Sequence, residues 1–361
     1  MIKPKVALFY DWLNQWGGAE KVLLDLIKLY PEAPVYTLIY DQKKTPWFPK
    51  ETKIITSFIN KLPLSKNNPF FYTPFYSFAL EQFDFSNFDI IISTSSTVGH
   101  CLLTPPSSLF LCYLHNVNRH IYQTKYPYPL SKIISNYKKT DLIYSQRPDF
   151  LFCNSQTVQN RIKNTYHRQA KVIYPGIDTS FFTPSIKESK EKYFLTVSRL
   201  VDHKKIDLAI KACHQLNQKL YIVGTGRHQK KLLNLINSLN DPNIKLLGKV
   251  DNNKLLTLYQ NCQALICPQL EDFGLTPIEA QACGKPVIAY NKGGLTETVI
   301  NGKTGILFNF QTVKSLVLAL KKFNSKNFSP NICRTNAQKF SSKNFMLNFK
   351  KEIDLIWQNH Q

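Results

Sequence analysis

The chain has 361 residues, with 46 Lys and Arg against 24 Asp and Glu, and therefore a formal net charge of +22. This length predicts two domains, and a composition with 43% hydrophobic and 19% charged residues excludes a disordered basic tail. The charge favours an anionic partner: nucleic acid, an acidic membrane surface or a phosphorylated small molecule. Nucleic acid is not expected, because the sequence lacks a helix-turn-helix, zinc-finger or RRM signature.

The eight cysteines lie almost all in apolar segments without a Cys-x-x-Cys pair, which predicts buried thiols in a reducing compartment. A zinc site is not expected, since no histidine stands near these cysteines at ligand spacing. The chain starts directly with a strand pattern, and no stretch approaches the ~20 apolar residues of a membrane span. We therefore expect a cytoplasmic protein, with a peripheral position on the inner face of the cytoplasmic membrane as a further expectation.

Short apolar runs alternate with helical periodicity from the first residues onward. In the first half, strands are predicted at 6–10, 34–40, 89–93, 109–114, 151–154 and 171–174. Helices are predicted at 19–30 and 155–165, and the polar, Pro-containing segment 175–191 is typical of a linker.

The second half repeats this alternation. Strands are predicted at 193–198, 219–223, 244–247, 264–267 and 286–290, with helices near 207–216, 228–240, 253–261 and 277–283. Such alternation predicts parallel sheets covered on both faces. The fold class is therefore α/β, with two Rossmann-like doubly wound domains and ligands at the carboxyl ends of the strands and in the cleft between the domains.

The stretch 271–286 predicts a helix N-terminus directly after a buried strand. Thr276 suits an N-cap, Pro277 the first helical position, and Glu279 the third position of a capping box. Free backbone N–H groups at such a terminus suit a phosphate. The alternative is that Glu279 is only a cap and that Glu271, before the helix, is only a surface carboxylate.

Two cations follow the first strand of the second half. Arg199 suits bidentate contact with a phosphate, and Lys204 supplies a mobile point charge. A diphosphate leaving group accumulates negative charge as its bond to carbon breaks, so placed cations would lower the barrier. Gly224, Gly226 and Gly248 supply tight turns at the same edge. The alternative is that both cations are merely solvated.

Several ordered motifs resemble one known family. They are GGAEKV at 17–22, LHNVNR at 114–119, YPGID at 174–178, SRL at 198–200 with Lys204, Glu271 and Glu279 with seven residues between them, and Gly293-Gly294-x-x-Glu297. Together they resemble the retaining nucleotide-sugar glycosyltransferases of family 4, over roughly residues 5–350. The resemblance implies a GT-B fold, in which two Rossmann-like domains face a central cleft. The expected domains are an acceptor-side domain at 1–178, a nucleotide-sugar domain at 179–340, and a final helix at 341–361 that returns to the first domain.

The resemblance also implies donor-side roles. Arg199 and Lys204 would hold the donor diphosphate, and Glu279 the ribose hydroxyls. Glu271 would hold the transferred sugar. The backbone of Phe273, Gly274 and Leu275 would hold the same sugar. The turn from Gly248 to Val250 would contact the base through its backbone.

In the first domain, the resemblance implies that Gly17 and Gly18 let a loop approach the donor phosphate and the acceptor. His115 would lie near the anomeric carbon, so the expected catalytic residues are His115, Glu271, Arg199 and Lys204. Arg119 and Tyr72 are acceptor-side candidates.

The sequence also bears on cofactor and donor. No Asp-x-Asp pair is present to hold a cation on a diphosphate, so we expect Arg199 and Lys204 to replace the metal's charge and no cofactor to be needed. Without a second placed carboxylate to act as nucleophile, same-face transfer with retention is favoured. Mannose is the favoured sugar, although the sequence has Asn116-Val117 and Pro175-Gly176 where the mannosyltransferase-like subgroup commonly has Thr-Pro and two prolines.

The expected function is transfer of a hexose from a nucleotide diphosphate sugar to a saccharide or polyprenyl-lipid-linked acceptor in cell-surface glycan synthesis. The alternatives are a nucleotide-sugar epimerase of the same architecture and a non-catalytic nucleotide-sugar or polyanion-binding module. The aromatic segment 69–76, flanked by Lys61 and Lys66, is open to three interpretations: acceptor binding, a membrane interface, or a cover for the core.

Overall fold

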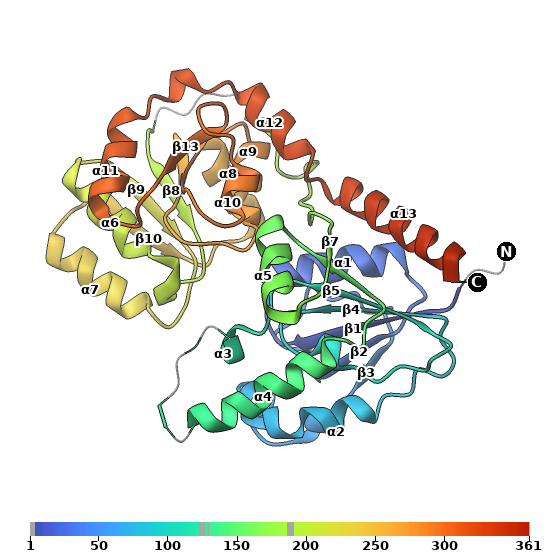
Figure 1. Ribbon diagram of the computed structural model, residues 1–361. Helices are drawn as coiled ribbons and strands as arrows, with labels where there is room; N and C mark the ends of the chain where they lie inside the picture. The colour runs from blue at the N-terminus through green and yellow to red at the C-terminus, as the bar shows by residue number, and fades with distance from the viewer. Residues whose placement is uncertain (1–3, 123, 125–126, 129, 186–190, 361) are drawn as a thin grey trace. The chain divides into compact units, whose positions relative to one another are not determined.

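The computed structural model describes residues 4–122, 124, 127–128, 130–185 and 191–360 (Figure 1). The chain divides into two compact units. Unit 1 comprises residues 1–175 together with 345–361, and unit 2 comprises residues 176–344.

Unit 1 is built on a seven-stranded parallel sheet in the order β3-β2-β1-β4-β5-β6-β7. Its strands are β1 (Val6–Leu13), β2 (Val35–Tyr40), β3 (Ile54–Thr56), β4 (Ile90–Ser95), β5 (Leu109–Leu114), β6 (Phe150–Cys153) and β7 (Lys171–Val172). The strand order reverses between β1 and β4, which is the place where doubly wound sheets bind ligands beyond the strand ends.

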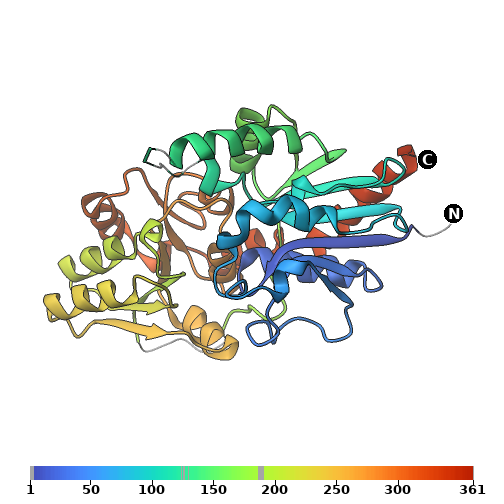
Figure 2. The same ribbon diagram turned by 90° about the horizontal axis from the view of Figure 1, so that it is seen from below.

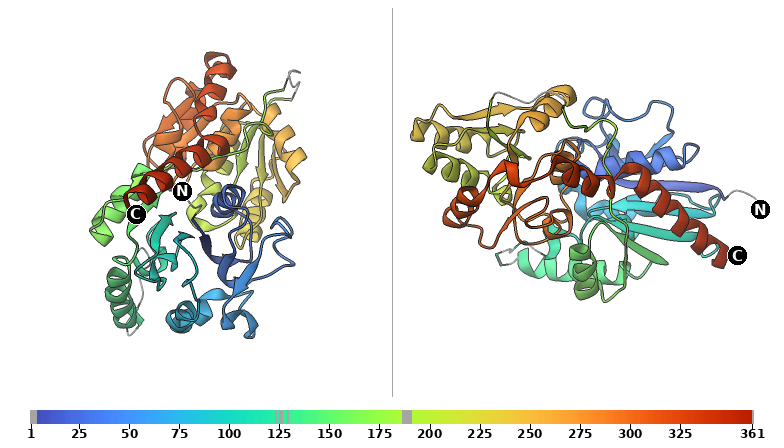
Figure 3. Two further views of the ribbon diagram at one scale, coloured as in Figure 1. Left: turned by 90° about the vertical axis from the view of Figure 1, so that its right-hand side faces the viewer. Right: turned by 90° about the horizontal axis from the view of Figure 1, so that it is seen from above.

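Successive strand residues in unit 1 face two different cores. Phe9 and Ile91 belong to one core, which α2 (Tyr76–Glu81) and α5 (Gln156–Tyr166) cover. Leu8 and Ile92 belong to the other, which α1 (Gly18–Leu29) and α13 (Ser342–His360) cover. Figures 1 and 3 show α13 lying across the sheet of unit 1. Three side chains of α13 enter that second core: Phe345, Phe349 and Ile353.

Between β2 and β6, unit 1 contains several short helical segments. They are η1 (Phe58–Lys61), η2 (Pro69–Phe75), η3 (Gly99–Cys101), α3 (Arg119–Tyr122) and the longer α4 (Leu130–Tyr144). The aromatic segment of the sequence forms η2 and the start of α2. Figure 2 shows α2 in front of the sheet of unit 1 when that unit is seen from below.

Unit 2 has a six-stranded parallel sheet in the order β10-β9-β8-β11-β12-β13. The strands are β8 (Phe194–Val197), β9 (Leu220–Val223), β10 (Ile244–Gly248), β11 (Ala264–Cys267), β12 (Val287–Tyr290) and β13 (Gly305–Phe308). One core contains side chains of α6 (Ile206–Gln215), α7 (Gln229–Leu239) and α11 (Val313–Lys322). The helix α9 (Leu275–Ala282) packs against α8 (Asn252–Asn261), α10 (Leu295–Thr298) and α12 (Pro330–Gln338).

Two parallel sheets with helices on their faces confirm the α/β prediction. The order reverses again in unit 2, between β8 and β11. The edge strands β3 and β13 were not predicted.

All eight cysteines are buried and free, as the sequence predicts. None of the helices in the described residues combines the length and apolar character that a membrane crossing needs.

Candidate functional site

An ion pair lies at the strand-order reversal of unit 2. Lys204 ends η4 (Asp202–Lys204), which follows β8, and Glu271 lies on the loop after β11. Lys204 Nζ is 2.5 Å from Glu271 Oε1, and the two side chains are only 12% and 19% exposed. Gln269 Nε2 donates to the same carboxylate oxygen at 2.9 Å. The pair therefore ties together the two loops where a ligand of this sheet is expected.

Glu271 is held in place by two glycines that follow β12. The Gly294 N–H donates to the Glu271 carbonyl at 2.9 Å. Gly293 has φ +70, and a Cβ there would overlap that same carbonyl oxygen. A side chain at this position would therefore displace the loop that carries the Glu271 carboxylate.

Arg199 is exposed on the loop that follows β8. Its loop rests on the glycine turn after β9, where the Leu200 N–H donates to the Thr225 carbonyl at 2.9 Å. Gly224 has φ +135, and a Cβ on it would overlap the Ser198 carbonyl oxygen. The turn after β9 thus fixes the backbone that presents the Arg199 guanidinium.

The start of α9 differs from the prediction. Gly274, with φ +96, is the N-cap, so α9 begins at Leu275 and Thr276 already lies in its first turn. The predicted capping box is wrong. The Glu279 side chain instead accepts a hydrogen bond from the Tyr259 hydroxyl at 2.8 Å, and Glu279 is only 3% exposed. Gly274 can adopt the left-handed conformation, so the helix starts two residues before the predicted first residue, Pro277. The Glu279 carboxylate, which was expected to cap this helix, is instead bonded to the Tyr259 hydroxyl.

The remaining donor-side residues also belong to unit 2. Phe273 is buried, with its ring 5.6 Å from that of Phe340, so only its backbone can contact a ligand. Gly248 has φ +69 and its carbonyl accepts the Gly224 N–H at 2.8 Å, next to half-buried Val250. The structure therefore places Gly248 and Val250 at the carboxyl end of β10, Phe273 and Gly274 on the loop after β11, and Leu275 and Glu279 in α9, which follows that loop.

In unit 1, the glycine loop precedes α1. Gly17 is the N-cap residue, with extended backbone, and Gly18 begins the helix. A Cβ on Gly17 would lie 3.0 Å from Glu20 Oε2. The Tyr10 hydroxyl donates to Glu20 Oε1 at 2.7 Å, so this buried carboxylate joins β1 to α1 directly beneath the loop.

His115 follows β5 and is 8% exposed. Its Nε2 lies 2.9 Å from Thr94 Oγ1. Burial lowers the pKa of His115 to about 3, so the imidazole is neutral at physiological pH. A neutral ring can exchange hydrogen bonds with hydroxyl groups without bringing a charge into the site.

The two acceptor-side candidates lie elsewhere in unit 1. Arg119 is half-buried at the start of α3. The Tyr72 ring packs against the core that α2 and α5 cover, and its hydroxyl donates to the Pro63 carbonyl at 2.6 Å. For Tyr72, the structure therefore shows a role in holding η2 to the preceding loop.

Asp11 is an organising residue that the sequence analysis missed. Its buried carboxylate accepts hydrogen bonds from Ser95 Oγ at 2.7 Å, the Ser96 N–H at 2.8 Å and Thr97 Oγ1 at 2.9 Å. The Ser95 carbonyl in turn accepts the His115 N–H at 2.8 Å. Asp11 therefore fixes the last residue of β4, to which the His115 backbone is bonded, together with the loop that follows. The available signal was a carboxylate inside an apolar strand pattern.

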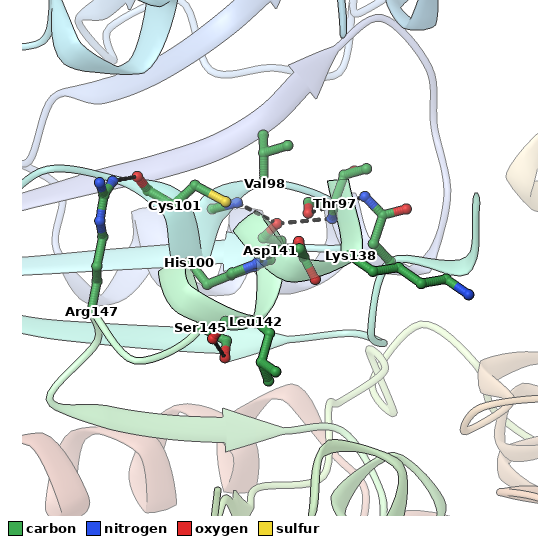
Figure 4. Close-up of polar contacts among 12 residues, drawn as sticks. Thr97, Val98, His100, Cys101, Lys138, Asp141, Leu142, Ser145 and Arg147 are labelled. Carbon is green, nitrogen blue, oxygen red and sulfur yellow. Dashed lines mark hydrogen bonds and ion pairs between the residues drawn. The ribbon is translucent and has the colours of Figure 1, made fainter. Parts of the chain in front are cut away.

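Among the described residues, one group of side chains brings three metal-ligand atoms within 4.8 Å of one another: His100, Cys101 and Asp141 (Figure 4). Figure 4 shows His100 directed at Asp141, and its Nε2 lies 2.9 Å from Asp141 Oδ1. Burial alone would lower the pKa of His100, but the acidic Cys101 and Asp141 groups beside it raise the pKa well above its usual value. The arrangement is that of an internal ion pair that joins η3 to α4.

Comparison with known proteins identifies the family. The family model described as glycosyl transferases group 1 matches residues 178–340, and the model described as Glycosyltransferase Family 4 matches residues 16–181. The two models together extend from residue 16 to residue 340.

Curated relatives match parts of the chain. An uncharacterized glycosyltransferase of Methanocaldococcus jannaschii is 31% identical over 44% of this chain and 45% of its own length. An alpha-1,3/1,6-mannosyltransferase of Dictyostelium discoideum is 32% identical over 48% of this chain and 47% of its own. A GDP-mannose-dependent monoacylated alpha-(1-6)-phosphatidylinositol monomannoside mannosyltransferase of Corynebacterium glutamicum is 31% identical over 46% and 51%. The matches thus span about half the length of these relatives.

Solved structures match along almost the whole chain. Sucrose-phosphate synthase of Thermosynechococcus elongatus has a TM-score of 0.80 at 18% identity, covering 98% of this chain and 100% of that one. Anabaena HepE in complex with UDP and glucose has a TM-score of 0.75 at 20% identity, with the same coverage. These likenesses show the fold, and the family models show the kinship. The chain belongs to the group 1, family 4 glycosyltransferases and has their GT-B fold.

Proposed function

We propose that the protein transfers a hexose, with mannose favoured, from a nucleotide diphosphate sugar to a saccharide or lipid-linked acceptor. The observation that carries this proposal is the Lys204–Glu271 pair at the strand-order reversal of unit 2, directly before the N-terminus of α9. The mannosyltransferase names of two relatives support the reaction class and the sugar. The complex of HepE with UDP-glucose supports a nucleotide-sugar donor.

In this proposal, the Lys204–Glu271 pair is the resting state of the donor site. The donor would separate the two groups: Lys204 would turn to the diphosphate, together with Arg199, and Glu271 would accept a hydroxyl of the sugar. The carboxylate would thereby keep Lys204 positioned until the diphosphate replaces it. Because the cations would be in place before the bond breaks, they would stabilise the charge that develops on the leaving group.

The proposed reaction proceeds on one face of the sugar. The bond between the anomeric carbon and the diphosphate oxygen breaks, and a bond from that carbon to the acceptor oxygen forms. The acceptor's proton passes to the leaving phosphate oxygen. Because the new bond forms on the face that the diphosphate leaves, the configuration of the anomeric carbon is retained. Arg199 and Lys204 would supply the charge that a metal ion supplies in other enzymes, and neutral His115 would contact a hydroxyl of the sugar or acceptor.

A nucleotide-sugar panel tests the proposal. Guanosine, uridine and thymidine diphosphate sugars are each added to the protein, and the thermal unfolding midpoint is measured. A donor at about 100 times its Kd adds ~2.7 kcal/mol of stability, so we expect one base to raise the midpoint clearly. That donor is then supplied with candidate acceptors, and nucleotide release is followed. If no nucleotide sugar raises the midpoint, the proposed donor site is wrong.

A further inference from the structure

Unit 1 exposes a cluster of large apolar side chains on one short stretch of chain. We call the exposed side chains of Leu64, Phe70, Phe71, Phe75 and Phe78 the aromatic surface. Their exposed fractions are 69%, 42%, 68%, 49% and 66%. Single exposed apolar residues are common, but five of them between residues 64 and 78, on the loop before η2, on η2 and on α2, are typical of an interaction surface.

The same stretch is firmly attached on its other side. Tyr76, Ala79 and Leu80 of α2 are buried in the core of unit 1. The Tyr76 hydroxyl donates to the Pro69 carbonyl at 2.6 Å, and the Phe70 ring lies 5.0 Å from that of Trp12. The segment therefore has a buried side that is anchored in the core of unit 1 and an exposed side that carries the aromatic surface.

Lysines are the charged residues of the stretch that carries the aromatic surface, up to the exposed Glu81 at the end of α2. Residues 52–80 contain three lysines, Lys53, Lys61 and Lys66, and no acidic residue. All three lysines are exposed. Lys61 and Lys66 line a pocket of about 530 Å³ together with Asn60, Leu62, Leu64, Ser65 and Asn67. A cationic and amide-lined hollow beside apolar rings is complementary to a phosphate group attached to acyl chains.

We infer that the aromatic surface docks on an anionic phospholipid bilayer. The phenylalanine rings would enter the boundary between headgroups and acyl chains, and Lys61 and Lys66 would contact lipid phosphates. Apolar area and lysines act together in such binding, and each favours the negatively charged leaflet. This inference concerns a surface of unit 1 and stands independently of the transfer reaction.

Vesicle binding tests the inference without donor or acceptor. The protein is sedimented with vesicles of phosphatidylcholine alone and of phosphatidylcholine and phosphatidylglycerol in equal parts. We expect binding to the anionic vesicles only. The double variant Phe71→Ser/Phe78→Ser should bind them at least about tenfold more weakly, because two exposed rings are lost from the membrane contact. Lys61→Glu/Lys66→Glu should also bind more weakly, and raised salt should weaken the wild type.

The matched control is Phe310→Ser in unit 2, which removes a ring that is 70% exposed. It should leave vesicle binding unchanged. All variants alter exposed side chains, so their thermal unfolding midpoints should equal that of the wild type. Equal binding of wild type and Phe71→Ser/Phe78→Ser overturns the inference. The inference is also overturned if Phe71→Ser/Phe78→Ser keeps vesicle binding but loses self-association, because the surface would then bind a second copy of the chain. It is likewise overturned if the variant keeps vesicle binding but loses transfer to a soluble acceptor, because the surface would then bind the acceptor.

Discussion

Lys204 Nζ and Glu271 Oε1 lie 2.5 Å apart, although the two residues are 67 positions apart in the sequence. The contact joins the loop after β8 to the loop after β11, which are neighbouring strands at the order reversal of the sheet. A partly buried ion pair is costly to break by removing one partner, because the other charge remains desolvated. An anionic ligand can relieve that cost by pairing with the lysine.

Removing either partner should greatly slow transfer. We expect Lys204→Ala and Glu271→Ala each to lower kcat/KM by about a hundredfold or more, the size of effect seen when a group that stabilises developing charge is removed. Nucleotide release from the donor measures this. The control is the exposed pair Lys219–Glu191 of the same unit, 2.8 Å apart, whose alanine variants should keep wild-type turnover. Full turnover in Lys204→Ala or Glu271→Ala would show that the donor site lies elsewhere.

Transfer should not require a divalent cation. Since Arg199 and Lys204 carry the charge assigned to a metal in other transferases, an excess of chelator should leave the rate unchanged. The same assay with added magnesium or manganese serves as the control for residual metal. A loss of activity on chelation, restored by metal, would contradict this assignment.

A methyl group at Gly293 should displace Glu271. Gly293→Ala places a Cβ against the Glu271 carbonyl in a backbone with φ +70, and we expect at least about a tenfold loss of kcat/KM. Gly302→Ala is the matched control, because it has φ +77 but nothing within 4 Å of the added Cβ. It should cost only about 1 kcal/mol of conformational free energy and leave turnover intact. Equal activity losses in the two variants would point to general destabilisation.

Tyr259→Phe should affect donor binding more than the chemical step. The variant removes the hydroxyl that orients the Glu279 carboxylate, so the KM for the donor should rise while kcat changes little. Losing a buried hydrogen bond to a charged group should also lower the free energy of unfolding by about 1.5–3 kcal/mol. In the control Tyr193→Phe, the lost hydroxyl donates to the Leu258 carbonyl instead, and the KM should stay constant. A constant KM in both variants would show that the Glu279 carboxylate does not bind the donor.

His115 should make the protein less stable in acid. Its folded-state pKa, about 3, lies below the ordinary value of 6.5, so between these values the unfolded chain binds a proton that the native chain does not. The free energy of unfolding should therefore fall as pH drops below 6.5, by at most about 1.4 kcal/mol per pH unit from this residue. His115→Asn should remove that part of the slope in urea unfolding between pH 6.5 and about 4. An unchanged slope would mean that the imidazole is accessible to protons in the folded protein.

The regular elements were largely predictable because their signal is local. Buried parallel strands are continuous apolar runs, and amphipathic helices repeat every three to four residues. The strand β3 escaped prediction because it has three residues, all half-buried at an edge of the sheet. The helix α4 escaped because most of its side chains are exposed, which leaves no clear apolar stripe.

The contacts that organise the site were less predictable. The sequence placed Lys204 and Glu271 at strand ends, but their direct pairing depends on which strands are neighbours. Asp11 accepts hydrogen bonds from residues that are 84–87 positions away, so no local sequence pattern indicates its role. The capping box failed because the competing partner, Tyr259, lies on another helix. The functional roles of all these residues stay predictions until the variants are measured.

The three side chains that α13 contributes to unit 1 have a consequence for biosynthesis. Residues 1–175 leave the ribosome first, yet Phe345, Phe349 and Ile353 complete one of their two cores. Domains generally fold as units during synthesis, but here the first unit must wait, with apolar surface uncovered, until the whole of unit 2 has been translated. The nascent chain should therefore acquire its protease-resistant units in reverse order, unit 2 before unit 1.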